Sequence, residues 1–288
     1  MDSLQQLITS YAYNILGSVE DAKDIAQDLQ LEKFKRKGDA IENEKAYFIR
    51  AAINRAINAK NRQRKMLPGY PGIWLPEPVA TERADHDLNQ KDILSYSLMV
   101  LLEKLDARQR AVFILKEAFD YDHEEIAQVL NISVENSRKI LSRARKEVKA
   151  KSRNPVVKAP AGYLDRFINI IRSGDTARLE QLLSNDVVLM SDGGGKAAAA
   201  LHPLSGKHKA LAFLSGIYRK FYQDKRIEKV LVNHNPALFF YEQGKLTTCQ
   251  VFELQNEKIV GIYFVRNPDK LVSLQQGSNA SSQLSACR

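Results

Sequence analysis

The stretch DHEEIAQVLNISVENSRKILSRARKEVKAK, residues 122–151, carries the local signals of two short helices joined by a tight turn. Asp122 and Glu125 have the spacing of a capping box, so a helix is expected to begin after Asp122. Asn131, Ile132 and Ser133 supply the turn, and Ser133 is placed to cap the second helix. The stretch therefore predicts a helix-turn-helix, a motif whose second helix has the width of a DNA major groove.

The predicted second helix is strongly basic on its outer side. Ile140, Ala144 and Val148 recur every four residues and are expected to point inward. The remaining positions place cations along the outside, at Arg138, Lys139, Arg143, Arg145, Lys146 and Lys149. The preceding segment, in which Asp106 and Gln109 can cap a further helix, is expected to complete the core. The alternative is a helical hairpin with a solvated charged face.

A second basic segment, AINRAINAKNRQRK at residues 52–65, holds Arg55, Lys60, Arg62, Arg64 and Lys65 without one acid. Helical spacing predicts that Ile49, Ile53 and Ile57 bury one side, while another side carries Arg50, Asn54, Asn58 and Arg62. Cations hold phosphates and asparagine amides hydrogen-bond base edges, so the mixture suits nucleic acid, including unpaired strands. A basic helix that only faces solvent is the alternative.

The segment just upstream, SVEDAKDIAQDLQLEKF at residues 18–34, is acidic instead. Glu20, Asp21, Asp24 and Asp28 spread negative charge over two predicted helical turns, opposite an apolar side. Such a face would repel DNA. It is either a solvated surface or a docking site for a positively charged protein.

Composition and breaks in pattern set the wider organisation. The chain has 288 residues, 44% of them hydrophobic, and this length and composition predict several folded domains. Its net charge of +9 is compatible with a polyanionic partner. It has two cysteines and no apolar stretch of about 18 residues, so we expect a cytoplasmic protein without a membrane span. Clusters of proline and glycine at 67–80 and 153–162 mark boundaries.

Beyond residue 160 the pattern changes. Helical periodicity at 163–172, 176–183 and about 207–221 accompanies strand-like runs such as ALFFYE, LTTCQVFEL and KIVGIYFV, which are joined by short turns. This half is expected to form an α+β domain with a curved antiparallel sheet. GSNASSQLSACR, at the end, is a polar tail.

In this order, and with the proline-rich segment between them, the acidic, Asn/Arg-rich and helix-turn-helix segments resemble the extracytoplasmic-function sigma factors of bacterial RNA polymerase. The motifs WLPEP (Trp74–Pro78), DGGGK (Asp192–Lys196) and NPDKL (Asn267–Leu271) resemble those of a subgroup with a SnoaL-like, NTF2-like C-terminal cone. That subgroup usually has Arg where this chain has Lys196.

The resemblance implies a multidomain fold, with two all-α sigma domains followed by an α+β cone. We expect region 2 at 1–67, a linker with WLPEP at 68–91, region 4 at 92–153, the SnoaL-like domain at 160–274 and a flexible tail at 275–288. The implied partners are core RNA polymerase and promoter DNA, with a small molecule in the cone as a further candidate. No cofactor and no membrane partner is expected.

The resemblance also implies residue roles. Contacts with the polymerase are expected from Asp21, Asp24, Ile25, Gln27 and Asp28. Contacts with the minus-10 element are expected from Asn54, Arg55, Asn58, Asn61 and Arg62, and contacts with the minus-35 element from Arg138, Lys139, Ser142 and Arg143. Regulatory contacts between domains are expected from Trp74, Leu75, Pro76, Glu77, Pro78, Asp192, Gly193, Gly194, Gly195, Lys196, Asn267, Pro268, Asp269, Lys270 and Leu271.

Without the resemblance, each of the three motifs has a simpler interpretation. WLPEP is then a stiff polyproline-like linker, DGGGK a flexible turn and NPDKL a turn that ends the last strand. Two other functions also compete with the sigma factor. One is a helix-turn-helix regulator with a ligand-sensing cone, and the other is a SnoaL-type enzyme that would use groups such as Asp192, His202, His208 and His234. We expect no enzymatic activity, because no pair of these residues has a diagnostic spacing.

Overall fold

The computed structural model describes residues 3–36, 43–82, 88–149, 159–222 and 224–275. It divides into two compact units. The helical unit comprises residues 1–68, 84–94 and 98–152, and the cone unit comprises residues 69–83, 95–97 and 153–288. Most of the proline-rich linker thus belongs to the cone unit. The expected tail lies outside the described residues from position 276 onward.

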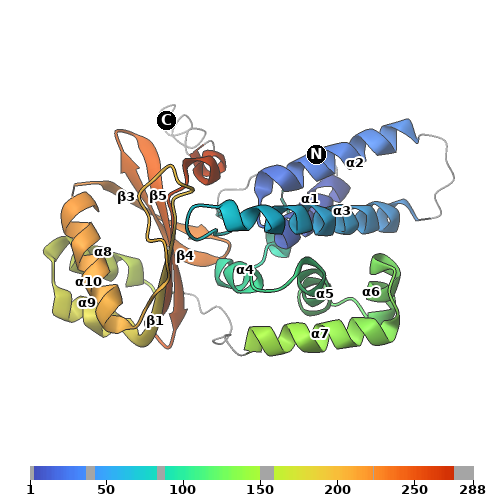
Figure 1. The fold of residues 1–288 in the computed structure, drawn as a ribbon. Helices are drawn as coiled ribbons and strands as arrows, with labels where there is room; N and C mark the ends of the chain where they lie inside the picture. Colours follow the sequence, from blue (N-terminus) through green and yellow to red (C-terminus); the bar gives the residue numbers. More distant parts are fainter. Residues whose placement is uncertain (1–2, 37–42, 83–87, 150–158, 223, 276–288) are drawn as a thin grey trace. The chain divides into compact units, whose positions relative to one another are not determined.

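Three helices open the helical unit: α1 (Ser3–Leu16), α2 (Val19–Lys35) and α3 (Glu44–Met66) (Figure 1). The side chain of Ser18 caps α2 by accepting from the Asp21 amide, and Asn43 caps α3 in the same way. The predicted apolar positions form the core between them, as with Ala22, Leu29 and Ile53, each no more than 1% exposed. The expected helical domain at the N-terminus is confirmed.

The rest of the helical unit holds the short helix η2 (Gln90–Asp92), α5 (Ala107–Glu117), α6 (His123–Leu130) and α7 (Val134–Lys149). The short helices η1 (Leu67–Gly69) and α4 (Tyr96–Leu102) are divided between the two units, because Gly69, Tyr96 and Ser97 are counted with the cone unit. Both predicted capping boxes are present, at Asp106 with Gln109 and at Asp122 with Glu125. Asn131 ends α6 with a left-handed φ of 51°, which turns the chain into α7. The predicted helix-turn-helix is confirmed.

The cone unit contains α8 (Tyr163–Ser173), α9 (Thr176–Leu182), α10 (Lys207–Ile217), a π-helical turn η3 (Tyr218–Tyr222) and a short 3-10 helix η4 (Pro268–Leu271). Its strands are β1 (Leu183–Asp192), β2 (Leu204–Ser205), β3 (Arg226–Val232), β4 (Asn235–Glu242), β5 (Lys245–Gln255) and β6 (Lys258–Val265). They form one sheet in the order β2-β1-β6-β5-β4-β3.

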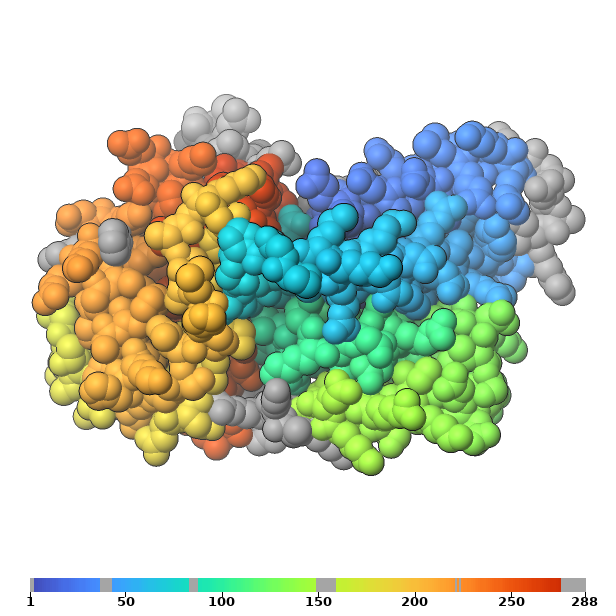
Figure 2. Space-filling model, in the orientation of Figure 1, coloured from blue at the N-terminus to red at the C-terminus, as the bar shows by residue number. Residues whose placement is uncertain are grey.

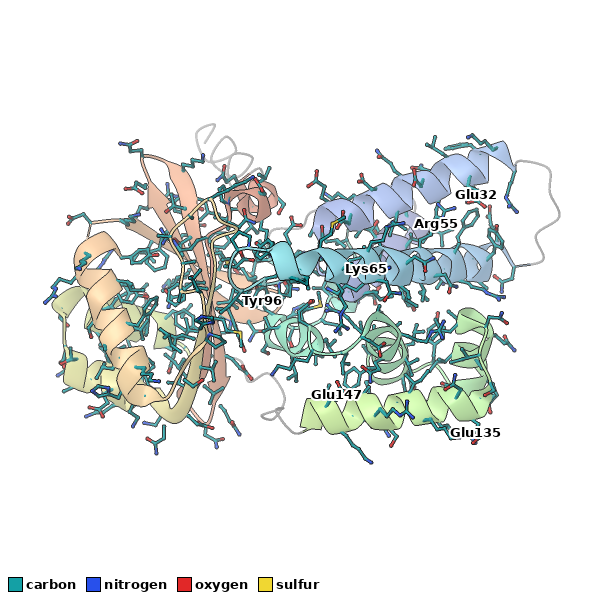
Figure 3. All side chains as sticks on the ribbon, viewed as in Figure 1. Glu32, Arg55, Lys65, Tyr96, Glu135 and Glu147 are labelled. Carbon is teal, nitrogen blue, oxygen red and sulfur yellow. The ribbon has the colours of Figure 1, made fainter. Side chains whose placement is uncertain are left out.

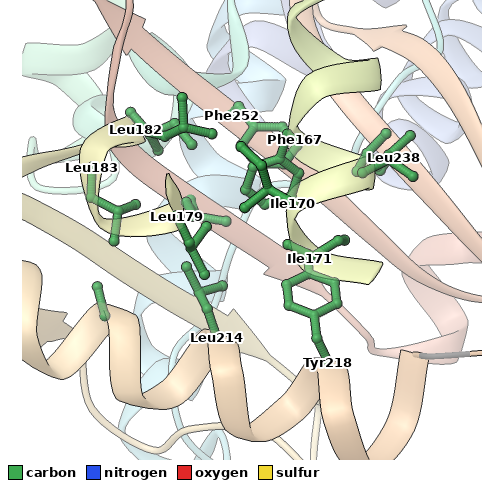
Figure 4. Close-up of a cluster of buried hydrophobic side chains, with 14 of the residues drawn as sticks. Phe167, Ile170, Ile171, Leu179, Leu182, Leu183, Leu214, Tyr218, Leu238 and Phe252 are labelled. Carbon is green, nitrogen blue, oxygen red and sulfur yellow. The ribbon is translucent and has the colours of Figure 1, made fainter. Parts of the chain in front are cut away.

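The expectation of a wholly antiparallel sheet is wrong at one place, because β1 and β6 are parallel. Local turn signals join β3 to β6 as hairpins, but they say nothing about β1, which reaches β6 only after the intervening chain has passed through α10. The three helices cover one face of the sheet (Figure 1). Between helices and sheet lies the core, in which Phe167 packs edge-on against Phe252 at 4.8 Å, beside Leu214 and Tyr218 (Figure 4).

Candidate polymerase, DNA and regulatory sites

The expected minus-35 residues lie on the outer side of α7. The side chains of Arg138 and Lys139 are 64% and 63% exposed, and Ser142 and Arg143 are also exposed. Arg138 lies 3.8 Å from Glu124 and Lys139 lies 2.6 Å from Glu135, both on the surface, where such pairs are weak and exchange readily for other partners.

The inner side of α7 is formed by Ser137, Leu141, Ala144 and Val148, with Ile140 half-buried. Leu141 was missed by the four-residue spacing that pointed to Ile140. The buried face of this helix is wider than a single stripe, as is usual for a helix packed on two neighbours.

The expected minus-10 residues on α3 fall into two groups. Asn58, Asn61 and Arg62 are exposed, whereas Asn54 and Arg55 are half-buried and already paired. Arg55 reaches Glu32 of α2 at 2.5 Å, and the two side chains point toward each other between the helices (Figure 3). The Asn54 amide donates to the carbonyls of Arg50 and Val129, each at 2.9 Å.

Lys60 does not belong to the basic surface to which its position in the sequence assigned it. It is 1% exposed, and its ammonium group donates to the Leu16 carbonyl at 2.9 Å and contacts both carboxylate oxygens of Glu103. A lysine that is spaced with the apolar positions Ile53 and Ile57 lies on the buried side of the helix. Residues 52–65 contain no acidic residue, and the partner of Lys60 is Glu103, 43 residues further along the chain.

On α2 the acidic face is open. Asp21, Asp24, Gln27 and Asp28 are exposed, whereas Ile25 is buried with the core. Ile25 thus contributes to packing within the helical unit in this structure. Two apolar side chains that the sequence reasoning missed, Leu31 and Phe34, are 58% and 63% exposed one turn further along. Large apolar groups beside an acidic face are typical of a surface that docks on another protein.

In the cone unit, the WLPEP segment is packed against the sheet. Leu75, Pro76, Glu77 and Pro78 are buried, and Trp74 is half-buried. Further along, Ala80 pairs with Val232 at the end of edge strand β3, and the Thr81 amide donates to the Leu231 carbonyl at 3.0 Å. The segment is therefore buried and anchored on both sides, and it does not form the free polyproline spacer that is its simpler interpretation.

The carboxylate of Asp192 is the centre of this packing. It is fully buried and accepts hydrogen bonds from the Tyr70 hydroxyl at 2.6 Å, the Leu75 amide at 2.9 Å and the Gly194 amide at 3.0 Å. Lys270 forms an ion pair with it at 2.7 Å. Burial of the Tyr70 hydroxyl and its hydrogen bond to Asp192 raise the pKa of Tyr70, so it remains a neutral donor.

Lys270 connects the NPDKL motif with the linker. Its ammonium group lies 4.0 Å from the centre of the Trp74 ring, donates to the Leu75 carbonyl and pairs with Asp192. A lysine that lies over an indole face and is also paired with a fully buried carboxylate makes a strong anchor, because the ion pair is shielded from water. We call Tyr70, Trp74, Asp192 and Lys270 the linker clamp.

The glycines of DGGGK let the backbone enter this clamp. A Cβ on Gly193 would lie 2.0 Å from the Ala197 carbonyl oxygen, and one on Gly194 would lie 2.3 Å from the amide nitrogen of Asn267. Gly194 and Gly195 also have positive φ values of 59° and 71°, which other residues rarely adopt. The motif is thus a close-packed turn, not a flexible one.

The remaining motif residues support the clamp from outside. Asn267 donates to the Tyr70 hydroxyl at 3.1 Å and caps η4 by accepting from the Asp269 amide. Ser273 donates to Glu77 of the WLPEP segment at 3.1 Å. Lys196, where the resembling subgroup has arginine, pairs with Asp269 on the surface at 2.5 Å. The three motifs, far apart in the sequence, therefore meet within one unit.

The described residues contain no helix that is both long and apolar enough to cross a membrane. Within the same residues, no three histidine, cysteine or acidic side chains gather closely enough to hold a metal ion. His202, His208 and His234 are all exposed.

Comparison with known proteins agrees with this geometry. Residues 95–148 match the family model for region 4 of the sigma-70 proteins. Across 298 aligned residues, covering 93% of this chain and 91% of the relative, the chain is 28% identical to the ECF RNA polymerase sigma factor SigJ of Mycobacterium tuberculosis. It is also 25% identical to SigG of that organism, over 63% of this chain and 57% of the relative.

The fold matches a solved relative as well. The crystal structure of M. tuberculosis SigJ aligns with a TM-score of 0.77 at 26% identity, covering 94% of this chain and 96% of that one. The sigma-70 region 4 match, the nearly full-length similarity and the shared fold confirm the resemblance to extracytoplasmic-function sigma factors. The chain is similar to these proteins, and its described residues from 159 onward form the C-terminal α+β domain that the resemblance implied.

Proposed function

We propose that the chain directs promoter-specific transcription initiation as the sigma subunit of a bacterial RNA polymerase, in the cytoplasm, and that its cone unit regulates it in cis. The observation that carries the proposal is the combination of an exposed acidic helix, α2, with a basic helix-turn-helix in one helical unit. A simple operator-binding regulator needs the second element but not the first.

The proposed division of roles follows the charges. Asp21, Asp24, Gln27 and Asp28, with the exposed Leu31 and Phe34, would dock on the polymerase. Arg138, Lys139, Ser142 and Arg143 would read the minus-35 duplex from α7, and Asn54, Arg55, Asn58, Asn61 and Arg62 would hold the minus-10 strand from α3. The polymerase, and not this chain, would perform the chemistry of nucleotide transfer.

Initiation in vitro tests this proposal. Purified chain is mixed with core polymerase and a library of promoter fragments, and transcription starts are mapped. Selective starts are expected with the wild type. Arg138→Ala should weaken minus-35 recognition by about 1–3 kcal/mol, as for the loss of one base contact, and should relax selectivity there. Tight binding to core polymerase without selective starts would refute the assignment and favour the operator-binding alternative.

Regulation by the cone unit is supported by the linker clamp, which holds the chain segment that connects the two DNA-reading modules in sequence. Lys270→Met removes the positive charge that lies over Trp74 and beside Asp192, and it shortens the unbranched side chain by one atom. Lys196→Met, in the exposed pair, is the matched control. A changed yield of transcripts with the first and not the second is expected. Equal yields from both variants and the wild type would refute regulation through the clamp.

The cone is also a candidate receptor for a small molecule. A pocket of about 240 Å³ is lined by apolar, polar and charged residues, among them Leu179, Ser215, Tyr218, Arg172 and Asp175. The Ser215 hydroxyl and the Gln250 amide nitrogen are buried without a hydrogen-bond partner among the described residues. Tyr218 donates to Gln250 at 2.5 Å, and burial raises the pKa of its hydroxyl well above the ordinary value. A group held protonated in this way suits binding, and we propose no catalytic step.

A further inference from the structure

Helices α8 and α9 of the cone unit enclose a groove that takes no part in the roles proposed so far. It has a volume of about 690 Å³, and it is lined by residues that include Arg166, Asn169, Ile170, Arg178, Gln181 and Leu182. Ile170 and Leu182 are buried, whereas the two arginines and the two carboxamides are exposed. The groove therefore has an apolar floor and polar rims that face solvent.

The two helices carry the same short sequence pattern along this groove. RFINI, at 166–170, and RLEQL, at 178–182, each have an arginine first, a carboxamide three residues later and an aliphatic residue four residues later. Residues three and four apart share one face of a helix, so each helix presents all three kinds of side chain to the groove. The groove thus has the same chemical composition on both sides.

The charges of the groove are of one sign. Among the described residues that line it there are two guanidinium groups and no carboxylate. Arg178 lies 3.3 Å from Asp175, but its side chain is 73% exposed, and a surface pair of this kind is weak. Lys258 donates to the Gln181 carbonyl and adds a cation beside the groove. The carboxamides of Asn169 and Gln181 both donate and accept hydrogen bonds. A peptide that carries carboxylates and an aliphatic side chain therefore fits this groove.

The outer side of α2 has the complementary composition. Asp24, Asp28 and Leu31 follow each other at intervals of one helical turn, so they share one face, and all three are exposed. Figure 2 shows the blue atoms of α2 on the surface of the helical unit. Carboxylates form strong, forked hydrogen bonds with guanidinium groups, and Leu31, which is 58% exposed, offers an aliphatic group for the floor of the groove. An amphipathic helix laid in a groove is a recurrent mode of recognition.

We propose that α2 of one copy of the chain docks in the α8–α9 groove of a second copy, so that the protein associates with itself. Both surfaces are exposed in this structure, which leaves each of them open to another molecule. Only the consequence of the contact rests on the proposed sigma function. In a chain that docks on polymerase through α2, self-association competes with the polymerase for the same acidic face.

The test is sedimentation velocity of the full-length chain over a wide range of concentrations. The sedimentation coefficient of the wild type should rise with concentration at low salt and rise less at high salt, because the attraction is between exposed charges. The groove variant, Arg166→Glu with Arg178→Glu, and the helix variant, Asp24→Lys with Asp28→Lys, should each remain monomeric. All four positions are exposed, and circular dichroism checks that both variants keep their helices.

A mixture of the two variants provides the sharpest result. The groove variant retains the native α2 and the helix variant retains the native groove, so one native contact can form between them. We expect an equimolar mixture to associate although neither variant does so alone. The matched control for the groove variant is Lys209→Glu with Lys220→Glu, which changes the net charge equally at two other exposed positions of the cone unit. The control should associate like the wild type.

A wild type that stays monomeric at low salt would overturn the proposal, and this is also the result expected if α2 binds the groove of its own chain. Association that persists in both variants, or a mixture that stays monomeric, would overturn it as well, because the contact would then lie elsewhere. Loss of association in the control would show that only net charge matters and would have the same effect.

Core polymerase tests the consequence separately. Its addition should dissociate the self-associated wild type, and the groove variant should bind it more tightly, by roughly the factor by which the monomeric fraction rises. Equal binding by both, in a chain that initiates selectively, would overturn the competition. If the wild type associates with itself but initiates nowhere, the sigma function fails and the self-association stands. The two failures are therefore distinguishable.

Discussion

In each unit one carboxylate lies at the centre of a polar network, Glu103 in the helical unit and Asp192 in the cone unit, and the two are stabilised in different ways. In the helical unit Glu103 faces two cations, Lys60 and Arg110. In the cone unit Asp192 faces one cation, Lys270, together with a tyrosine hydroxyl and two backbone amides. In the first cluster, the two cations come from α3 and α5, two helices that are far apart in the sequence. The second is enclosed by a glycine turn and an indole ring.

Similar chemistry thus serves different purposes in the two units: one carboxylate fixes a turn, and the other joins helices that can separate. Hydrogen bonds from backbone amides cannot be removed without moving the chain, so Asp192 fixes the linker clamp as part of the fold. Three long side chains can separate as their helices part, so the Glu103 cluster can define a contact that breaks and re-forms. Four measurements test this contrast, in decreasing order of their expected effect.

Asp192→Ala should have the largest effect. It leaves Lys270 buried without a carboxylate and removes the acceptor of three hydrogen bonds, so the free energy of unfolding of the cone unit should fall by about 3–5 kcal/mol. Urea unfolding followed by the fluorescence of Trp74, the single tryptophan, measures this directly. A loss below about 1 kcal/mol would mean that the clamp is not part of the fold.

Lowering the pH should reduce the free energy of unfolding of the helical unit, because Glu103 becomes protonated. Burial alone would raise its pKa, but Arg110 and Lys60 outweigh burial and hold the pKa below its ordinary 4.5. The contribution of this carboxylate is therefore complete above that ordinary value and is lost as the pH falls through the lower, folded-state pKa. Urea unfolding by circular dichroism at several acidic pH values should show a steeper fall in the wild type than in Glu103→Gln. Equal slopes would contradict the role of the carboxylate.

Gly194→Ala should cost about 1–3 kcal/mol, because its Cβ would overlap the Asn267 side chain and its φ is 59°. Gly244→Ala is the matched control, since that glycine also has a positive φ, 79°, but nothing within 4 Å of a Cβ. The difference between the two isolates the close packing from the backbone strain. If both variants lose the same stability, the packing of the turn against Asn267 is unimportant.

Lys196→Ala should have the smallest effect, about 0–1 kcal/mol, because its pair with Asp269 is on the surface. Thermal unfolding of this variant should differ little from the wild type, and the difference should shrink further in high salt. A loss comparable to that of Asp192→Ala would show that the surface pair is coupled to the clamp.

Local patterns carried most of the fold. The capping boxes at Asp106 and Asp122, the turn at Asn131 and the strand-like runs after residue 235 all depend on residues close in sequence, and the structure has each of them. The parallel pairing of β1 with β6 was not predictable in this way, because the two strands are separated by most of the cone unit. The exposure of Leu31 and Phe34 could have been predicted from the sequence, because their helical positions lie outside the buried apolar face of α2.

Charged residues show most clearly what cannot be predicted from the sequence. Local sequence was enough to predict the capped helix starts at Asp106 and Asp122, the motifs that the chain carries and the basic character of α3 and α7, since these follow from neighbours within a few residues. The burial of Lys60 against Glu103, and the hydrogen bond from Tyr70 to Asp192, 122 residues away, depend on the folded chain and could not be predicted from local sequence. A charged residue looks the same in a sequence whether it meets water or a partner. Its role depends on which distant group the folded chain brings within hydrogen-bonding distance.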